Sequence, residues 1–172
     1  MSKEGSILNF IFAGVVIDIL LGSDGVGHDK QKTDGTASSF IKQYYPLAIS
    51  AGKTYPVPAD FTISQAILES NSGTSHLFKN SNNAFGIKAN LLWRGNKFMG
   101  YRAYDTPEDS FADHSKFLAS NSRYKAAFNY TDPLQFAQAV ATAGYAEDPQ
   151  YINKIAKLLP LVQQIKQQLG IS

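Results

Sequence analysis

The stretch QAILESNSGTSHLFKNSNNAFGIKA, residues 65–89, decides the fold of this 172-residue chain. It begins as an amphipathic helix, with Ala66 and Ile67 on the apolar side, and it places one carboxylate, Glu69, at the end of that helix. A run of small polar residues follows, and then the turn NNAFG, residues 82–86. We therefore expect a helix that ends near Glu69, a short helical piece over residues 75–79 between two turns, and a turn that carries an aromatic side chain and a glycine.

The composition is typical of a globular domain and does not indicate metal or cofactor chemistry. A hydrophobic content of 44% and a charged content of 17% are typical of a chain with a real core. The chain has no cysteine, which excludes disulfides and cysteine-ligated metal, and its three histidines lack metal-ligand spacing. We predict no metal and no cofactor. The net charge of +2 is too small to favour nucleic acid as a partner.

The N-terminal segment ILNFIFAGVVIDILL, residues 7–21, is apolar apart from Asn9 and Asp18. It is shorter than the roughly 20 apolar residues that a bilayer span requires. Three interpretations remain open: an export signal or membrane anchor, a helix docked on a partner or within an assembly, and a helix packed on the protein's own domain.

The next segment, GSDGVGHDKQKTDGT at residues 22–36, holds four glycines, three aspartates and a single apolar residue. Such a composition is typical of a flexible linker. We therefore predict an apolar N-terminal segment over 1–21, a linker over 22–36 and one domain over 37–172.

The body of the chain reads as about six helices and one small β element. Capping residues followed by proline predict helix starts, with Thr106 and Asp109 as a reciprocal pair and with Asp132 and Asp148 as further caps. Asp60 is a candidate cap for the helix that ends near Glu69. Other expectations are a kink or an early stop at Pro46, a kink at Pro160, and short strands or an irregular hairpin between residues 84 and 105. The pattern predicts a mostly α, α+β domain with a cleft.

Glu69 is the first candidate for chemistry. The dipole of its helix opposes a negative charge at the C-terminal end, and partial burial would raise the carboxyl pKa in the same direction. A raised pKa is what a general acid working near neutral pH requires. The alternative is a solvent-exposed charge at a frayed helix end.

Further candidates carry aromatic, amide or carboxylate groups in loops. Trp93 suits stacking on a sugar, and tyrosines in loops can orient a hydroxyl or a water. Core or capping roles are the alternative for each aromatic residue, and an ordinary turn is the alternative for the loop that contains Asn83 and Phe85. The candidates for substrate contact are Asn83, Phe85, Trp93, Tyr101 and Tyr151, the candidate beside the reaction centre is Tyr145, and the freer acids are Asp105 and Asp113.

Three segments, in order, resemble glycoside hydrolase family 73, the bacterial endo-β-N-acetylglucosaminidases that include the flagellar peptidoglycan hydrolase domain and several autolysins. The first is the opening stretch 65–89. The second is YRAYDTPEDSFADHSKFL at 101–118, and the third is AGYAEDPQYINKI at 143–155. The resemblance extends over roughly residues 38–160.

The resemblance implies a lysozyme-like fold, with a helical lobe and a small β hairpin lobe bordering a groove. It implies cleavage of the β-1,4 bonds of the peptidoglycan glycan strand, with Glu69 as the general acid and Tyr145 beside the reaction centre. The Asn-Asn-x-Phe-Gly segment, residues 82–86, would help to shape the groove. Such a protein would act after export to the cell envelope or outside the cell, or be carried on a phage particle.

Two departures from the family pattern affect the mechanism. Asn71 and Ser72 replace the family's usual Gly-Trp pair, and the stretch from Ala89 to Ala103 contains no Asp or Glu, although many members carry a second acid there. Three mechanisms remain open: attack by the substrate's own acetamido group, a water activated by another acid such as Asp105, and lytic transglycosylase-like cleavage. We favour the first. A non-catalytic wall-binding or structural module, in a phage particle or a secretion apparatus, is the alternative function.

Overall fold

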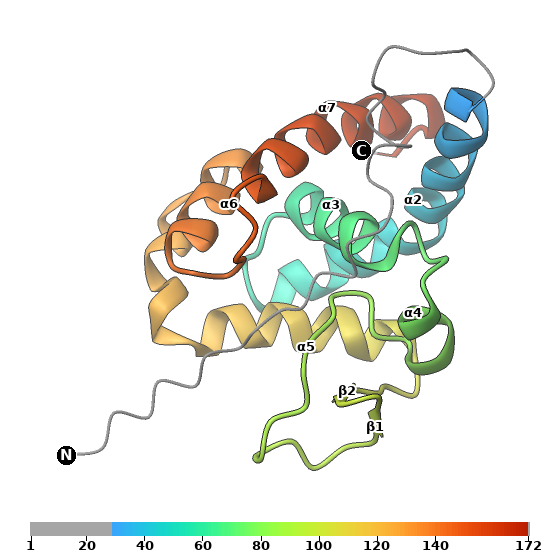
Figure 1. Ribbon diagram of the computed structural model, residues 1–172. Helices are drawn as coiled ribbons and strands as arrows, with labels where there is room; N and C mark the ends of the chain where they lie inside the picture. Colours follow the sequence, from blue (N-terminus) through green and yellow to red (C-terminus); the bar gives the residue numbers. More distant parts are fainter. Residues whose placement is uncertain (1–28, 172) are drawn as a thin grey trace.

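The computed structural model describes residues 29–171, with side chains described from residue 36. Within this part the chain forms six α-helices, one 3₁₀ helix and a two-stranded sheet (Figure 1). In chain order they are α2 (Asp29–Thr54), α3 (Ala59–Ser70), α4 (His76–Ser81), β1 (Lys97–Phe98), β2 (Tyr101–Arg102), α5 (Pro107–Ser120), η1 (Ser122–Asn129), α6 (Pro133–Thr142) and α7 (Tyr151–Leu169). The expectation of a mostly α domain with a small β element is confirmed.

Helix α3 is the centre of the arrangement, because it contacts α2, α6 and α7 (Figure 1). Every residue from Phe61 to Ile67 is buried. Ile63, Ala66 and Ile67 belong to a core shared with α2, α5 and α7, whereas Phe61 belongs to a second core shared with η1, α6 and α7. A helix with apolar residues on opposite sides requires cover on both sides, and α3 obtains it by lying between two cores.

The two ends of α3 differ in how well the sequence predicts them. The helix ends at Ser70 as expected, and Asn71 closes it in a left-handed conformation with φ 50° while its N–H donates to Ile67 O. The prediction that Asp60 caps the helix is wrong, because no side chain caps the N-terminal end. The Asp60 carboxylate instead accepts hydrogen bonds from Tyr45 Oη at 2.5 Å and Lys166 Nζ at 2.9 Å.

The predicted caps at the other helix starts also differ in outcome. Thr106 and Asp109 form the predicted capping box of α5, and Asp132 caps α6 through two backbone N–H groups. The prediction that Asp148 caps the last helix is wrong, because α7 begins at Tyr151. Asp148 instead accepts a hydrogen bond from Gln150 N and pairs with Lys154 at 2.7 Å.

The start of the described part lies inside the predicted linker. Helix α2 begins at Asp29, so residues 29–36 of the predicted linker are helical. The helix continues past Pro46, so the prediction of an early stop at this proline is wrong. Residues 7–21 lie outside the described residues, and the domain limits stay predictions. None of the described helices is both long enough and apolar enough to cross a membrane.

The small β element is the expected hairpin. Strand β1 pairs antiparallel with β2, with Lys97 opposite Arg102 and Phe98 opposite Tyr101. Two contacts tie this hairpin to α5: Arg102 Nη1 lies 2.6 Å from Asp113 Oδ2, and Tyr104 Oη donates to the same oxygen at 2.7 Å. Figure 1 shows the hairpin beside α5, on the side away from the other long helices.

We expect Asp60→Ala to lower the free energy of unfolding by about 2 kcal/mol, because the substitution leaves Tyr45 and the half-buried Lys166 without their shared acceptor. Urea unfolding followed by circular dichroism measures the change. The control is Glu147→Ala, which removes an exposed carboxylate. Equal stability of the two variants would contradict this account of how α2, α3 and α7 are joined.

Candidate functional site

Glu69 lies in the last turn of α3 and is half-buried rather than exposed at a frayed end. The loop 82–86 returns to it, since a Cβ built on Gly86 would lie 3.8 Å from Glu69 Oε2. Gly86 has φ +62°, a conformation that favours glycine. Glu69 and the aromatic-glycine turn, which lie far apart in the stretch 65–89, are therefore close in space.

The surroundings of Glu69 change its acidity. Burial raises the pKa of the carboxyl from 4.5 to about 7, and the positive charge of Lys154 offsets only part of that rise. A pKa in this range keeps part of the Glu69 population protonated near neutral pH. Such a carboxyl can give up a proton and take it back within one reaction cycle.

A buried polar cluster lies beside Glu69. Gln65, one helical turn earlier on α3, donates a hydrogen bond from Nε2 to Tyr151 Oη, and the rings of Tyr145 and Tyr151 lie 5.9 Å apart. Burial raises the pKa of both phenols well above its usual value, and the charge of Glu69 acts in the same direction. Both tyrosines are therefore neutral at neutral pH and can donate hydrogen bonds.

Gln65 belongs to this cluster, although the sequence analysis did not select it. Its side chain is fully buried on a helix whose other buried positions are mostly apolar. Two signals pointed to it: an amide on an apolar helix, and a spacing of four residues from Glu69, which places both side chains on one face. Neither signal identifies Tyr151 as its partner, 86 residues along the chain.

The loop that carries Gly86 is held from inside. Asn83 is 1% exposed; its Oδ1 accepts from Phe85 N and Ile87 N, and its Nδ2 donates to Ile87 O at 3.0 Å. The Phe85 ring, fully buried, stacks on His114 of α5 at 3.9 Å between ring centroids. Asn83 and Phe85, two of the candidates for substrate contact, therefore use their side chains to stabilise the conformation of the loop.

The remaining aromatic candidates are in the β lobe. Trp93 is half-buried, donates from Nε1 to Asn96 O at 2.8 Å, and has the Arg102 guanidinium 4.7 Å from its ring centroid. Tyr101 is half-buried in β2. Arg102 N donates to Ile87 O at 2.9 Å, so this lobe is joined directly to the loop that faces Glu69.

The two candidate second acids occupy different environments. Asp113 is engaged by Arg102 and Tyr104, the contacts that hold the hairpin on α5. Asp105 is exposed at the start of the segment leading to α5. Among the described residues, no carboxylate contributes to the pKa shift of Glu69.

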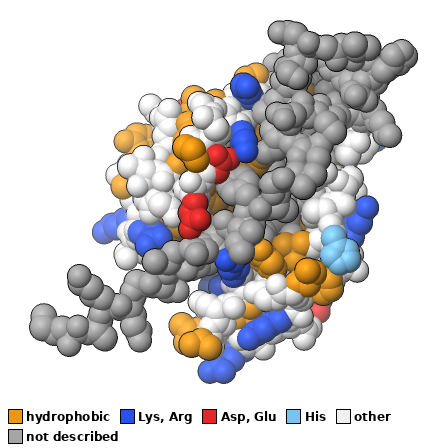
Figure 2. All heavy atoms as spheres, in the orientation of Figure 1, with side chains coloured by type: hydrophobic (Ala, Val, Ile, Leu, Met, Phe, Trp, Pro, Cys, Tyr) orange, Lys and Arg blue, Asp and Glu red, His pale blue; other side chains and the backbone are white. Residues whose placement is uncertain are grey.

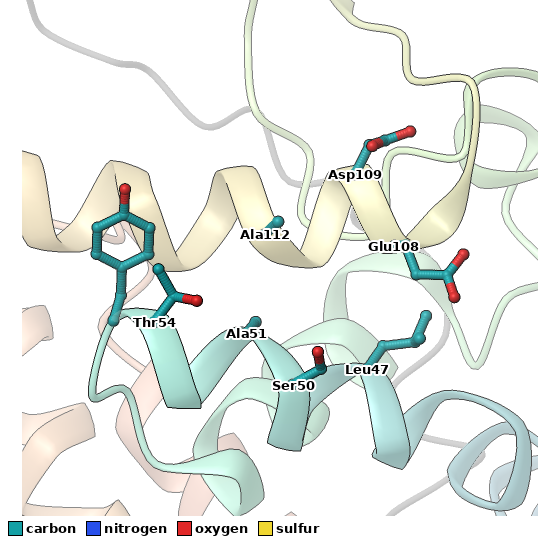
Figure 3. Close-up of a pocket in the computed structure, with 8 residues that line it drawn as sticks. Leu47, Ser50, Ala51, Thr54, Glu108, Asp109 and Ala112 are labelled. Carbon is teal, nitrogen blue, oxygen red and sulfur yellow. The ribbon is translucent and has the colours of Figure 1, made fainter.

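A pocket of about 230 Å³ lies elsewhere, between α2 and α5 (Figure 3). Its acidic lining residues are Glu108 and Asp109, and Asp109 is already engaged in the capping box of α5. The other lining residues are Leu47, Ser50, Ala51, Thr54, Tyr55 and Ala112. None of the candidate residues lines this pocket. Among the described side chains, residues 36–171, no cluster of three or more His, Asp or Glu is suited to a metal ion.

Comparison with known proteins gives a consistent result. Residues 45–164 match the glucosaminidase family, described as mannosyl-glycoprotein endo-beta-N-acetylglucosaminidase. The peptidoglycan hydrolase FlgJ of Pseudomonas aeruginosa is 32% identical over 149 residues, which cover 74% of this chain and 37% of that protein. The exo-glucosaminidase LytG of Bacillus subtilis is 32% identical over 124 residues, which cover 61% of this chain and 44% of LytG.

Solved structures agree in fold. The glycoside hydrolase domain of Salmonella typhimurium FlgJ has a TM-score of 0.69 at 27% identity, covering 78% of this chain and 92% of that domain. A peptidoglycan hydrolase from Sphingomonas sp. A1 gives 0.69 at 31% identity, covering 78% and 96%. The lysozyme-like α+β prediction is thereby confirmed. The chain spans only 37–51% of the length of the first FlgJ relatives.

We expect Glu69→Gln to be more stable than the original chain at high pH. The folded pKa of about 7 lies above the ordinary 4.5, so the folded state binds more protons between these values and stability falls as pH rises through that window. The relative gain of the variant should reach up to about 3 kcal/mol above pH 7.

Urea unfolding at a series of pH values from 4 to 9 measures this difference. The control, Glu147→Gln, changes an exposed carboxylate and should give a difference that does not vary through the same window. A pH-independent difference for Glu69→Gln would show that the carboxyl is not the buried acid described above.

Proposed function

The chain belongs to the glucosaminidase family, and from that membership we propose that it is a peptidoglycan hydrolase that cleaves β-1,4 glycosidic bonds of the glycan strand as an endo-β-N-acetylglucosaminidase. One observation carries the proposal: a half-buried glutamate at the end of α3 whose pKa is raised to about 7. The glycosidic oxygen is a poor leaving group until it is protonated, and an acid of this pKa supplies the proton near neutral pH.

We assign the first step to Glu69, which donates its proton to the leaving oxygen. The acetamido oxygen of the substrate attacks the anomeric carbon as the glycosidic bond breaks, forming a cyclic oxazolinium. Water then adds to that carbon, the ring opens to restore the acetamide, and the Glu69 carboxylate takes the proton from the water. This route needs one protein carboxylate, which agrees with the engagement of Asp113 by Arg102 and Tyr104 and with the lack of Asp and Glu in residues 89–103.

The neighbouring groups have supporting roles in this proposal. Tyr145 is the group beside the reaction centre, and the Gln65–Tyr151 hydrogen bond holds the neutral phenols against Glu69. The loop that contains Asn83 and Phe85 presents Gly86 to the carboxylate. Trp93 and Tyr101 are the proposed aromatic contacts with the glycan, whereas Tyr151, the remaining candidate, is 1% exposed and supports the site through its hydrogen bond with Gln65.

Two mechanisms compete with substrate assistance. An exposed acid such as Asp105 could activate the water, or the 6-hydroxyl of the sugar could attack and leave an anhydro product. A non-catalytic wall-binding or structural module of a phage particle or secretion apparatus is the competing function. The raised pKa of Glu69 favours the enzyme, because binding alone does not require a buried acid.

The proposed substrate determines where the protein would have to act. An enzyme that cleaves the glycan strand must reach the cell wall, by export to the envelope, release from the cell or transport on a particle. We keep residues 7–21 as a possible contact with a membrane or an assembly, a proposal that concerns a segment outside the described residues. Fractionation of cells producing the full chain or a chain lacking residues 1–21 tests it.

We expect Glu69→Gln to lower turnover of purified peptidoglycan by about 10²–10⁴-fold, the usual contribution of a general acid. Release of soluble muropeptides measures turnover, and mass spectrometry of the products separates hydrolysis from anhydro-sugar formation. Glu147→Gln, with the same chemical change at an exposed position, should retain full activity. Near-normal turnover by Glu69→Gln would refute the assignment, and an inactive original chain with intact binding would favour the non-catalytic module.

We expect activity to decrease as pH rises through about 7, because the acid must be protonated to act. Lys154→Met removes the positive charge that lowers the pKa of Glu69, so the alkaline limb of the profile should move to higher pH. Lys157→Met, an exposed position one turn later on α7, is the matched control and should leave the limb in place. Superimposable profiles for all three proteins would contradict this role of Lys154.

A further inference from the structure

The β lobe exposes aliphatic side chains that neither its own packing nor the proposed catalysis uses. Leu91 is 95% exposed, Leu92 80% and Met99 73%, and they are the three most exposed large apolar side chains of the described part. Single exposed apolar residues are common on protein surfaces, but three in one small lobe mark a contact surface. We refer to Leu91, Leu92 and Met99 as the hairpin patch.

The patch is built on an ordered pair of turns. Ala89 N donates to Gly100 O at 3.0 Å, which places the turn carrying Leu91 and Leu92 next to the turn carrying Met99. The first turn is closed by Trp93 N donating to Asn90 O at 3.2 Å, and Asn90 Oδ1 accepts from Leu92 N. The exposed side chains are therefore presented by hydrogen-bonded backbone.

The charged residues of the segment that carries the patch are all basic. From Ser70 to Tyr104 the chain contains five Lys or Arg residues and no Asp or Glu. Arg102 is paired with Asp113, whereas Arg94 and Lys97 are exposed in the same lobe as the patch. Figure 2 shows apolar and basic side chains side by side on the part of the molecule where Figure 1 places β1 and β2.

The side-chain types of the patch indicate which kind of partner it can bind. Flat aromatic rings suit stacking on sugars, whereas branched and thioether aliphatic chains suit hydrocarbon. Exposed aliphatic side chains with two exposed cations in the same lobe match the interface of a bilayer whose headgroups are negatively charged. We propose that the hairpin patch docks the β lobe on the surface of an anionic lipid bilayer, with Leu91, Leu92 and Met99 entering the headgroup region and Arg94 and Lys97 contacting the phosphates.

The chain contains its own reporter of this contact. Trp93 is its only tryptophan, and it directly follows Leu92 in the turn that carries the patch. Its fluorescence reports on the surroundings of this turn, and the patch variants described below separate a contact of the patch from one made by residues 7–21. The measurement needs no turnover, so its outcome is independent of whether the proposed hydrolase activity is correct.

The experiment titrates the full chain with vesicles of phosphatidylglycerol and phosphatidylcholine, with and without bromine on the acyl chains. We expect Trp93 emission to shift to the blue and to be quenched by the brominated lipid, and we expect both effects to weaken with added salt. Vesicles of phosphatidylcholine alone should give little change. An unchanged emission with anionic vesicles, or equal quenching by both kinds of vesicle, would overturn the proposal.

Variants identify the side chains responsible. Leu91→Ser with Leu92→Ser should weaken partitioning, measured by the Trp93 response, by about tenfold or more, as should Arg94→Gln with Lys97→Gln. Tyr130→Ser, which changes the exposed aromatic outside the lobe, should have no effect. Circular dichroism confirms that each variant folds, as expected for such exposed positions.

Two further measurements test other occupants of the patch. A concentration-dependent blue shift without vesicles would indicate a second copy of the chain, and a shift produced by soluble glycan fragments but not by vesicles would make the patch part of the sugar site. Either result would overturn the lipid proposal.

Discussion

The burial of α3 between two cores is the constraint on which the rest of the structure depends. Phe61 packs into one core, while Ile63, Ala66 and Ile67 pack into the other. Since the helix is held from both sides, its last turn cannot move without disturbing both cores, and Glu69 is in that turn. The position of the acid is therefore set by hydrophobic packing, and its raised pKa is a consequence of the same burial.

The opposite side of Glu69 is formed by a loop that depends on α5. Ser110 Oγ accepts from Ala84 N, and the Phe85 ring lies on His114, so one face of α5 supports the backbone that reaches Gly86. Asp113 on the same helix holds the β hairpin. One helix thus positions both the loop beside the acid and the lobe beyond it, and neither needs a large core of its own.

Features that depend on nearby residues could be predicted from the sequence. The caps Thr106 and Asp132 bind backbone groups within three residues, so a local motif identifies them. Asp60 and Asp148 have the same residue type at the same kind of position, yet Asp60 pairs with Lys166, and Asp148 accepts from Gln150 N before the helix begins and pairs with Lys154. The partner of Asp60 is 106 residues away, and no local pattern could reveal it.

The same distinction applies to the site. Glu69 was selected because a helix end and a family motif both point to it, whereas Gln65 acquires its place only when α7 brings Tyr151 to α3. The buried positions of Asn83 and Phe85 were not predictable, because a turn motif does not show which side of the loop faces the core.

The way in which the hairpin is attached also bears on how such a protein can change over evolution. Its anchors are Arg102 and Tyr104, whereas residues 90–96 between the paired backbone positions contribute no member of either core. Lengthening a surface loop costs little free energy, since the entropy of closure grows slowly with length. Insertions and deletions at this tip can therefore add or remove acidic groups while the anchors stay in place. The lobe can thus diversify independently of the scaffold that carries Glu69.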